Sequence, residues 1–401
     1  MATEVTGQPF DLRVPEIRDD PYPFYARMRE EDPVHRGPFG EWIVTRYDDV
    51  AMVLNDPRFS NDVRITELHR RRMEAMGERA AEFDTTFSMI GMDPPDHTRL
   101  RRLVQSGFSP RRVDALRPRI EQLVEGLLDP LARDGAMDLM AGFALPLPVT
   151  VICELLGVPV RDQPLFHDLV QGMLDDDGEL DEILERSFHA RVELEEYIGG
   201  LLEERRAHPR DDLMSALVRV EQEGDQLSAR EVVETAMLLF IAGHVTTVNL
   251  VGNGVLALLR HPEELRRMRD EPEMVKGGVE ELLRYDGPVH GVGRAALEDV
   301  ELHGTVIRRA DLVTAALPAA NRDPARFPDP DRLDLARTDR HHVAFGRGIH
   351  FCLGAPLARL EGQIAIPALL RRFPDLALAE GHELRWTGSF LRGLEALPVT
   401  A

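Results

Sequence analysis

The feature that most constrains this chain is a long apolar segment with helical spacing between residues 228 and 260. Ser228 and Glu231 have the S-x-x-E spacing of a capping box, which indicates that a helix begins there. At about 1.5 Å per residue, the predicted helix is roughly 45–50 Å long, enough to cross a whole domain. A helix that is apolar on most sides has to be buried. We therefore expect one central helix with the rest of the chain packed around it.

Most of the remaining chain also has helical patterning. Helices are expected at PYPFYARMREEDP, at RYDDVAMVLND and at residues 111–133, 142–156 and 181–207. A hairpin is expected at VHRGPFGEWIVT, and only residues 292–316 and the C-terminal tail look strand-like. Because no repeat, linker or shift in composition marks a boundary, the sequence predicts a single domain, residues 1–401, that is mainly α with a small β region.

Composition excludes several classes of protein. The two cysteines, Cys153 and Cys352, cannot provide the four ligands of an iron–sulfur cluster or a structural zinc site, and they make no disulfide framework. The net charge of −22 argues against nucleic acid as a partner, because phosphate repels an acidic surface. The N-terminal residues show no signal-peptide pattern, and polar residues interrupt the apolar run of the long helix. We expect a cytoplasmic protein with no membrane anchor.

A second informative segment is FGRGIHFCLG, residues 345–354. Its glycines remove Cβ atoms, so the backbone can adopt unusual dihedral angles and a broad, flat group can approach it. A strong helical pattern, APLARLEGQIAIPALLRRF, follows at once and places Cys352 just before a helix N-terminus. The N–H groups and the dipole there favour a thiolate, which could be a nucleophile or a metal ligand. A buried structural cysteine is the third reading of these residues.

The same loop resembles the haem-binding loop of the cytochrome P450 family. The resemblance rests on the phenylalanine, the glycines, the basic residues and the Cys-x-Gly spacing. It implies that Cys352 is the axial thiolate ligand to the iron of haem b. It also implies the family's fold, a triangular helical prism with a long central helix over the haem. The cofactor-binding residues of the loop would be Phe345, Gly346, His350, Cys352 and Gly354.

The segment EELLRYDGPVH matches the E-x-x-R pair of that family. Glu281 and Arg284 are three residues apart, which puts them on one face of a helix. The family completes this pair with a later arginine, which the resemblance places at Arg332 in NRDPARFPDPDRLDLAR. These three residues are expected to form a buried structural network on the haem side of the fold.

The segment DPPDHTRLRR resembles the family's propionate-binding helix. His97 and Arg101 are four residues apart on one helical face, and two donor groups at that spacing suit a pair of carboxylates. By the same resemblance, Arg294 and His350 should supply the other propionate contacts.

The stretch LLFIAGHVTTVNL in the long helix resembles the family's oxygen-binding groove. Ala242 and Gly243 would open the helix over the iron, and Thr246 would orient protons and water toward bound oxygen. The family usually has an acid just before this threonine, whereas this chain has Val245, which cannot carry a proton. His244, a chain of water molecules or a hydroxyl of the substrate would then deliver protons in place of the acid. Alternatively, proton delivery is slower in this chain, or its oxidation depends less on proton delivery. The remaining alternative is that valine replaces the acid without any effect on activity.

The resemblance implies a monooxygenase that uses O2 and two electrons to hydroxylate or epoxidise its substrate. The electrons would come from NAD(P)H through a ferredoxin and its reductase, with Arg102, Arg347 and Arg359 as candidate docking residues. Two alternatives remain open. The chain could be a haem protein that senses a gas or recruits partners without turnover, or a cysteine hydrolase that pairs Cys352 with His350. Haem content and NAD(P)H-dependent product formation separate these three.

The same resemblance places a substrate pocket at apolar positions of several segments. A hydrophobic small molecule is therefore expected, above all a secondary metabolite such as a macrolide or another polyketide, and we expect a monomeric enzyme. The acidic segment LDDDGELDE, residues 174–182, is expected to form an exposed tip between two lid helices. The expected lining residues are Met89, Ile90, Val289, Val292, Phe390 and Leu391.

Overall fold

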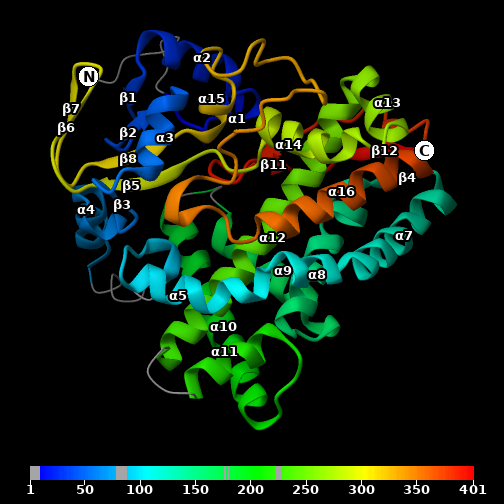
Figure 1. Ribbon diagram of the computed structural model, residues 1–401, viewed down its shortest axis with the longest axis horizontal. Coiled ribbons are helices and arrows are strands. Elements are labelled where there is room, and N and C mark those ends of the chain that lie inside the picture. The colour runs from blue at the N-terminus through cyan, green and yellow to red at the C-terminus, as the bar shows by residue number, and fades with distance from the viewer. Residues whose placement is uncertain (1–9, 78–87, 176–177, 179, 223–226) are drawn as a thin grey trace.

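A computed structural model describes residues 10–77, 88–175, 178, 180–222 and 227–401. Helices fill most of the molecule, and the main strands gather at one side (Figure 1). The fold is mainly α with a small β region, as the sequence predicts. The helices are α1 (Pro15–Asp19), α2 (Tyr22–Glu31), α3 (Tyr47–Asn55), α4 (Glu67–Met76), α5 (Asp96–Val104), α6 (Pro110–Ala115), α7 (Arg117–Asp134), α8 (Pro146–Leu156), α9 (Gln163–Leu174), α10 (Leu180–Ala207), α11 (Leu213–Gln222), α12 (Ala229–Leu259), α13 (Pro262–Asp270), α14 (Met274–Asp286), α15 (Leu317–Asn321) and α16 (Ala355–Arg372).

The long helix predicted from the sequence is α12, at the centre of the fold. Its capping box is complete, because the Ser228 hydroxyl accepts a hydrogen bond from the Glu231 N–H (3.3 Å) and the Ser228 N–H donates to the Glu231 carboxylate (2.8 Å). α12 packs against α8, α10, α14 and α16. It is long and apolar enough to cross a membrane, but most of its apolar stretch is buried inside the protein. Its burial identifies α12 as a core helix.

Two of the predicted helices are divided in the structure. The single helix expected at 111–133 is present as α6 and α7, and the one expected at 142–156 is a short π-helical turn at Met140–Ala144 followed by α8. Proline explains both divisions. It lies in the first turn of α7 and of α8, where its missing N–H does no harm, whereas inside a helix it would break a hydrogen bond.

A five-stranded sheet with the order β1-β2-β8-β5-β3 supports the N-terminal part of the chain. β1 and β2 form the predicted hairpin, and β2 pairs in parallel with β8 from a distant part of the sequence. The strand-like regions at 292–316 and in the tail are confirmed. The strands are β1 (Val34–Arg36), β2 (Trp42–Val44), β3 (Phe59–Ser60), β4 (Ala136–Asp138), β5 (Val292–Ala296), β6 (Val300–Leu302), β7 (Thr305–Ile307), β8 (Leu312–Ala315), β9 (Ala377–Leu378), β10 (Trp386–Thr387), β11 (Gly393–Leu394) and β12 (Pro398–Thr400).

A buried network of charged groups joins α14 to the irregular segment before the Cys352 loop. Arg284 is almost fully buried and donates to both carboxylate oxygens of Glu281, at 2.8 Å each. The second guanidinium on Glu281 belongs to Arg337, at 3.2 Å from each oxygen. The prediction that the Arg332 side chain completes the Glu281–Arg284 pair is wrong. Its side chain is exposed, and it offers only its backbone carbonyl oxygen, to Arg284 and Arg337.

We expect Arg337→Leu to lower the free energy of unfolding by about 2–3 kcal/mol, because the buried Glu281 then keeps one cation instead of two. Urea unfolding of the purified protein measures this loss. Arg332→Leu is the matched control and should change the same free energy by less than about 0.5 kcal/mol, since the backbone carbonyl remains. Equal losses in the two variants would contradict the assignment of Arg337.

Candidate active site

The loop from Phe345 to Gly354 ends immediately before α16, with Gly354 as the N-cap of that helix. The Cys352 N–H donates to the Phe345 carbonyl oxygen (2.9 Å), which closes the loop. Gly348 has a φ of +70°, and a Cβ atom there would lie 2.8 Å from the Leu54 carbonyl oxygen of α3. Only glycine fits such a position. The loop is thereby held between α3 and α16.

Two opposing effects act on the Cys352 thiol. Burial raises its pKa, while the backbone N–H groups of Gly354 and Ala355 and the guanidinium groups of Arg101 and Arg359 lower it by smaller amounts. The neutral thiol is therefore favoured in the protein alone, and a thiolate becomes favourable once a cation binds the sulfur. This balance suits a metal ligand better than a free nucleophile.

Four donor side chains converge beside the loop. His97 and Arg101 come from α5, Arg294 comes from β5, and His350 belongs to the loop itself. The ring centroids of His97 and His350 lie 4.0 Å apart. Burial, together with His97 and the two arginines, lowers the pKa of His350 to about 3. The structure therefore brings together the four residues predicted as propionate contacts, with a neutral His350 among them.

These donors have few acceptors within the part of the chain that the structure describes. Neither ring nitrogen of the buried His97 has a hydrogen-bond partner, and neither does Nε2 of His350. Arg101 and Arg294 each donate to one backbone carbonyl oxygen, at 2.6 and 2.8 Å. Burial lowers the pKa of the Arg294 guanidinium to about 10. A bound dicarboxylate would satisfy these groups, so the residues present fit the two propionates of haem.

One turn of α12 is partly exposed in the middle of this buried helix. Ala242 is exposed, and the Thr246 hydroxyl donates to the Ala242 carbonyl oxygen (2.8 Å). Being four residues apart, the two share a helix face. A Cβ atom at Gly243 would lie 2.9 Å from the Ile152 side chain of α8, so the missing side chain lets α8 pack closely. The role of Gly243 in opening the groove stays a prediction.

His244 points away from this face. Its ring is fully buried, and its Nε2 lies 3.1 Å from Nδ1 of His167 on α9. Burial and the neighbouring His167 lower the pKa of His244 to about 3. A neutral ring on the far side of the helix cannot deliver protons near Thr246, so the prediction of His244 as a catalytic group is wrong. Val245 is buried in the apolar core and brings no acid to the groove.

Comparisons with known proteins agree with this geometry. The cytochrome P450 family profile matches residues 37–382. Cytochrome P450 107B1 from Saccharopolyspora erythraea is 47% identical over 384 residues, which cover 94% of this chain and 93% of that protein. This chain belongs to the cytochrome P450 family. The family is one of haem-iron enzymes that use O2 and electrons, and the chain is accordingly a P450 monooxygenase.

Two further relatives of this P450 support the same placement. Cytochrome P450 monooxygenase PikC from Streptomyces venezuelae is 45% identical over 95% of this chain and 91% of its own length. Among solved structures, the cytochrome P450 PksS of the Bacillus subtilis 168 bacillaene polyketide synthase matches with a TM-score of 0.88. That match has 42% sequence identity and covers 98% of this chain and 99% of PksS.

The structure brings part of the predicted substrate-pocket wall of this P450 together. Val289 and Leu391 pair as an antiparallel bridge, and Met89 is buried in the same apolar core as the middle of α12. Ile90 and Phe390, by contrast, are 60% and 54% exposed, so both side chains lie at the surface. Residues 176, 177 and 179 of the acidic segment at 174–182 lie outside the described residues. The half-buried members of the wall are Val289, Val292 and Leu391.

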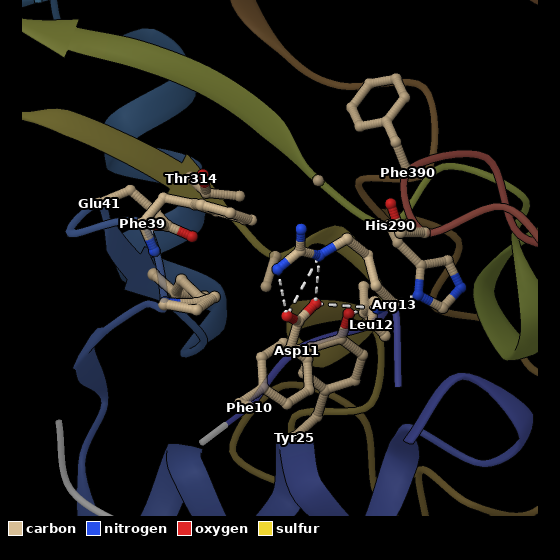
Figure 2. A pocket seen from close by; sticks show the side chains of 15 residues that line it. Phe10, Asp11, Leu12, Arg13, Tyr25, Phe39, Glu41, His290, Thr314 and Phe390 are labelled. Atoms are coloured by element: carbon tan, nitrogen blue, oxygen red, sulfur yellow. Dashed lines mark hydrogen bonds and ion pairs between the residues drawn. The ribbon is translucent and has the colours of Figure 1, made fainter. Parts of the chain in front are cut away.

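The exposed Phe390 lines a surface pocket beside the N-terminal segment. Figure 2 shows Phe390 beside His290 and across the pocket from Phe10 and Phe39, with the Arg13–Asp11 ion pair (2.6 Å) between them. Its contact with substrate stays a prediction, because the side chain is turned to a space on the outside of the wall.

A second surface pocket opens beside the Cys352 loop. Arg347 and Arg359, two of the predicted docking residues, both line it, and Arg359 also forms an ion pair with Glu280 (2.7 Å) and lies over the Phe345 ring (4.5 Å). The charge of Arg359 is therefore engaged within the protein. Sequence reasoning missed Arg340, which is exposed in the same pocket and belongs to no motif.

Proposed function

We propose that this P450 binds haem b through Cys352 and adds one oxygen atom of O2 to a hydrophobic small molecule, by hydroxylation or epoxidation. One observation carries the proposal. Beside Cys352, near the N-terminus of α16, lies a cluster of donor side chains that have few hydrogen-bond acceptors in the protein: His97, Arg101, Arg294 and His350. Coordinated by a thiolate, haem iron supplies O2 activation, in which two electrons and two protons release the second oxygen atom as water.

The chain's own residues would bind the cofactor and handle protons. Arg101 and Arg294 would hold the propionates, with the neutral rings of His97 and His350 as hydrogen-bond donors. The hydroxyl of Thr246 can both donate and accept a hydrogen bond. It lies on the exposed face of α12 and could hold a water molecule there and pass on its proton.

We infer a macrolide or another polyketide as the substrate class. The half-buried Val289, Val292 and Leu391 favour an apolar guest. The match to PksS, a cytochrome P450 named for the bacillaene polyketide synthase, supports this class. Met89, buried next to the core helix, fits the same apolar lining.

We further infer that a ferredoxin and its reductase deliver the electrons from NAD(P)H. Two cysteines cannot hold an iron–sulfur cluster in the chain itself. The pocket beside the Cys352 loop is lined by Arg340 and Arg347 and could attract an acidic partner. A cytoplasmic, monomeric enzyme without a nucleic-acid partner is part of the same proposal.

A spin-state titration of the ferric Soret band tests the substrate class. The panel contains macrolides, other polyketides, steroids, terpenoids and fatty acids. We expect a saturable shift with macrolides or other polyketides, because a guest that fills an apolar pocket displaces water from the iron. A shift with steroids or fatty acids alone, or with no compound, would contradict the proposed class. Product formation that depends on NAD(P)H and a ferredoxin then distinguishes the oxygenase from a haem sensor.

The missing acid beside Thr246 gives a second prediction. We expect Val245→Glu to release about two- to fivefold less peroxide per NAD(P)H consumed, and to form more product, because a carboxylate can supply protons that valine cannot. Val245→Leu is the matched control, since it changes the packing without adding an acid. An unchanged or higher peroxide yield in Val245→Glu would show that the valine does not limit proton delivery.

A further inference from the structure

α12 carries two buried asparagines that neither the cofactor contacts nor the oxygen groove accounts for. Asn249 and Asn253 are only 5% and 1% exposed. Together with Ala242 and Thr246 they lie along one face of α12, because successive steps of four, three and four residues return to the same side. A buried amide without partners costs free energy. The partners of these two amides therefore show what this face of the helix holds.

Both asparagines bind the loop formed by residues 388–394, called the Leu391 loop below. Nδ2 of Asn249 donates to the Leu391 carbonyl oxygen (3.3 Å). Nδ2 of Asn253 donates to the Arg392 carbonyl oxygen (3.2 Å) and to the Asp286 carbonyl oxygen at the end of α14 (3.4 Å). The core helix is thereby tied to the wall segment that pairs with Val289.

Two glycines leave no spare room at the Asn249 contact. A Cβ atom at Gly393 would lie 2.2 Å from Oδ1 and 2.5 Å from Nδ2 of Asn249. A Cβ atom at Gly388, which has a φ of +72°, would lie 2.4 Å from the Leu391 carbonyl oxygen. The backbone of the loop thus contacts the Asn249 amide directly, and a side chain at either glycine would displace it.

The two tethers differ in the side chains that hold the loop near them, while backbone hydrogen bonds from His290 to Phe390 and from Arg392 to Pro288 flank Leu391 (2.9 Å each). The guanidinium of Arg392 is buried, forms an ion pair with Asp286 (2.9 Å) and lies over the Trp386 ring (3.3 Å). The loop next to Asn253 therefore has other anchors. For the Leu391 carbonyl, Asn249 is the hydrogen-bond donor that the described part of the chain supplies.

We propose that Asn249 is a positioning residue that fixes Leu391 relative to Thr246 and thereby sets which substrates fit the pocket. Asn249 lies three residues after Thr246, about 4.5 Å further along the helix axis. A tether there sets the distance between the wall and the groove. The inference rests on the proposed function, because Leu391 acts as a pocket wall only if the chain is an oxygenase of the proposed kind.

Three variants test this role. Asn249→Leu keeps the branched shape of the side chain and removes the donor. Gly393→Ala disturbs the same contact from the loop side, which keeps the test valid if one variant folds poorly. Asn253→Leu is the matched control, since it removes the neighbouring amide where other anchors remain. The thermal midpoint and the haem content of each variant report on the fold.

Two measurements on these variants report on the position of Leu391 in the pocket wall and need no catalytic turnover. Hydrogen–deuterium exchange reports on residues 388–394. Soret titrations with imidazole and with 4-phenylimidazole use two ligands of the same iron, of which only the second has a phenyl ring to reach the wall. Asn249→Leu and Gly393→Ala should speed exchange of the Leu391 loop about fivefold or more. They should change the Kd of 4-phenylimidazole about threefold or more and that of imidazole less than about twofold.

The Asn253→Leu control defines which result would overturn the inference. Asn253→Leu should leave the Kd of 4-phenylimidazole within about twofold of the wild-type value. Unchanged 4-phenylimidazole binding in Asn249→Leu and Gly393→Ala, or an equal change in Asn253→Leu, would overturn the role of Asn249. A wild-type protein with no haem band would instead overturn the proposed function, and exchange in the Leu391 loop would still show whether the tether exists.

Discussion

The position of Cys352 just before α16 is the constraint on which the rest of the structure depends. The sulfur is largely buried, so its negative charge is acceptable only where N–H groups face it and a cation is bound to it. The glycine loop brings the chain to that point, and α3 and α16 hold the loop in place. Because α16 packs directly on α12, the proposed iron ligand and the exposed turn at Ala242 belong to one packed unit.

The second constraint is electrostatic. His97, Arg101, Arg294 and His350 are gathered in a buried site with few acceptors, an arrangement that is costly for the protein alone. An anionic group bound among them removes that cost, so cofactor binding and folding should support each other. The Glu281 network shows the opposite solution, because its buried arginines are fully matched by a carboxylate and backbone carbonyl groups.

Patterns local in the sequence predicted much of this structure, whereas side-chain direction did not follow from them. The capping box, the length of α12 and the cysteine loop are local features, and the structure has all three. Its sequence neighbours place His244 in the groove, yet packing against His167 of α9 turns its ring away. Arg337 could not be distinguished from Arg332, because an irregular segment has no period that reveals which arginine is buried. In the sequence Asn249 is only one of the polar residues that interrupt an apolar run, since its partner Leu391 is far along the chain.

The absorption spectrum of the reduced, CO-treated protein tests the central claim most directly. A thiolate opposite CO on haem iron moves the Soret band to clearly longer wavelength than a nitrogen ligand or a neutral ligand does. The account predicts this shifted band in the wild-type protein and its loss in Cys352→Ser. A haem-loaded wild-type protein without the shifted band, or a Cys352→Ser variant that retains it, would contradict the assignment of Cys352 as the thiolate ligand.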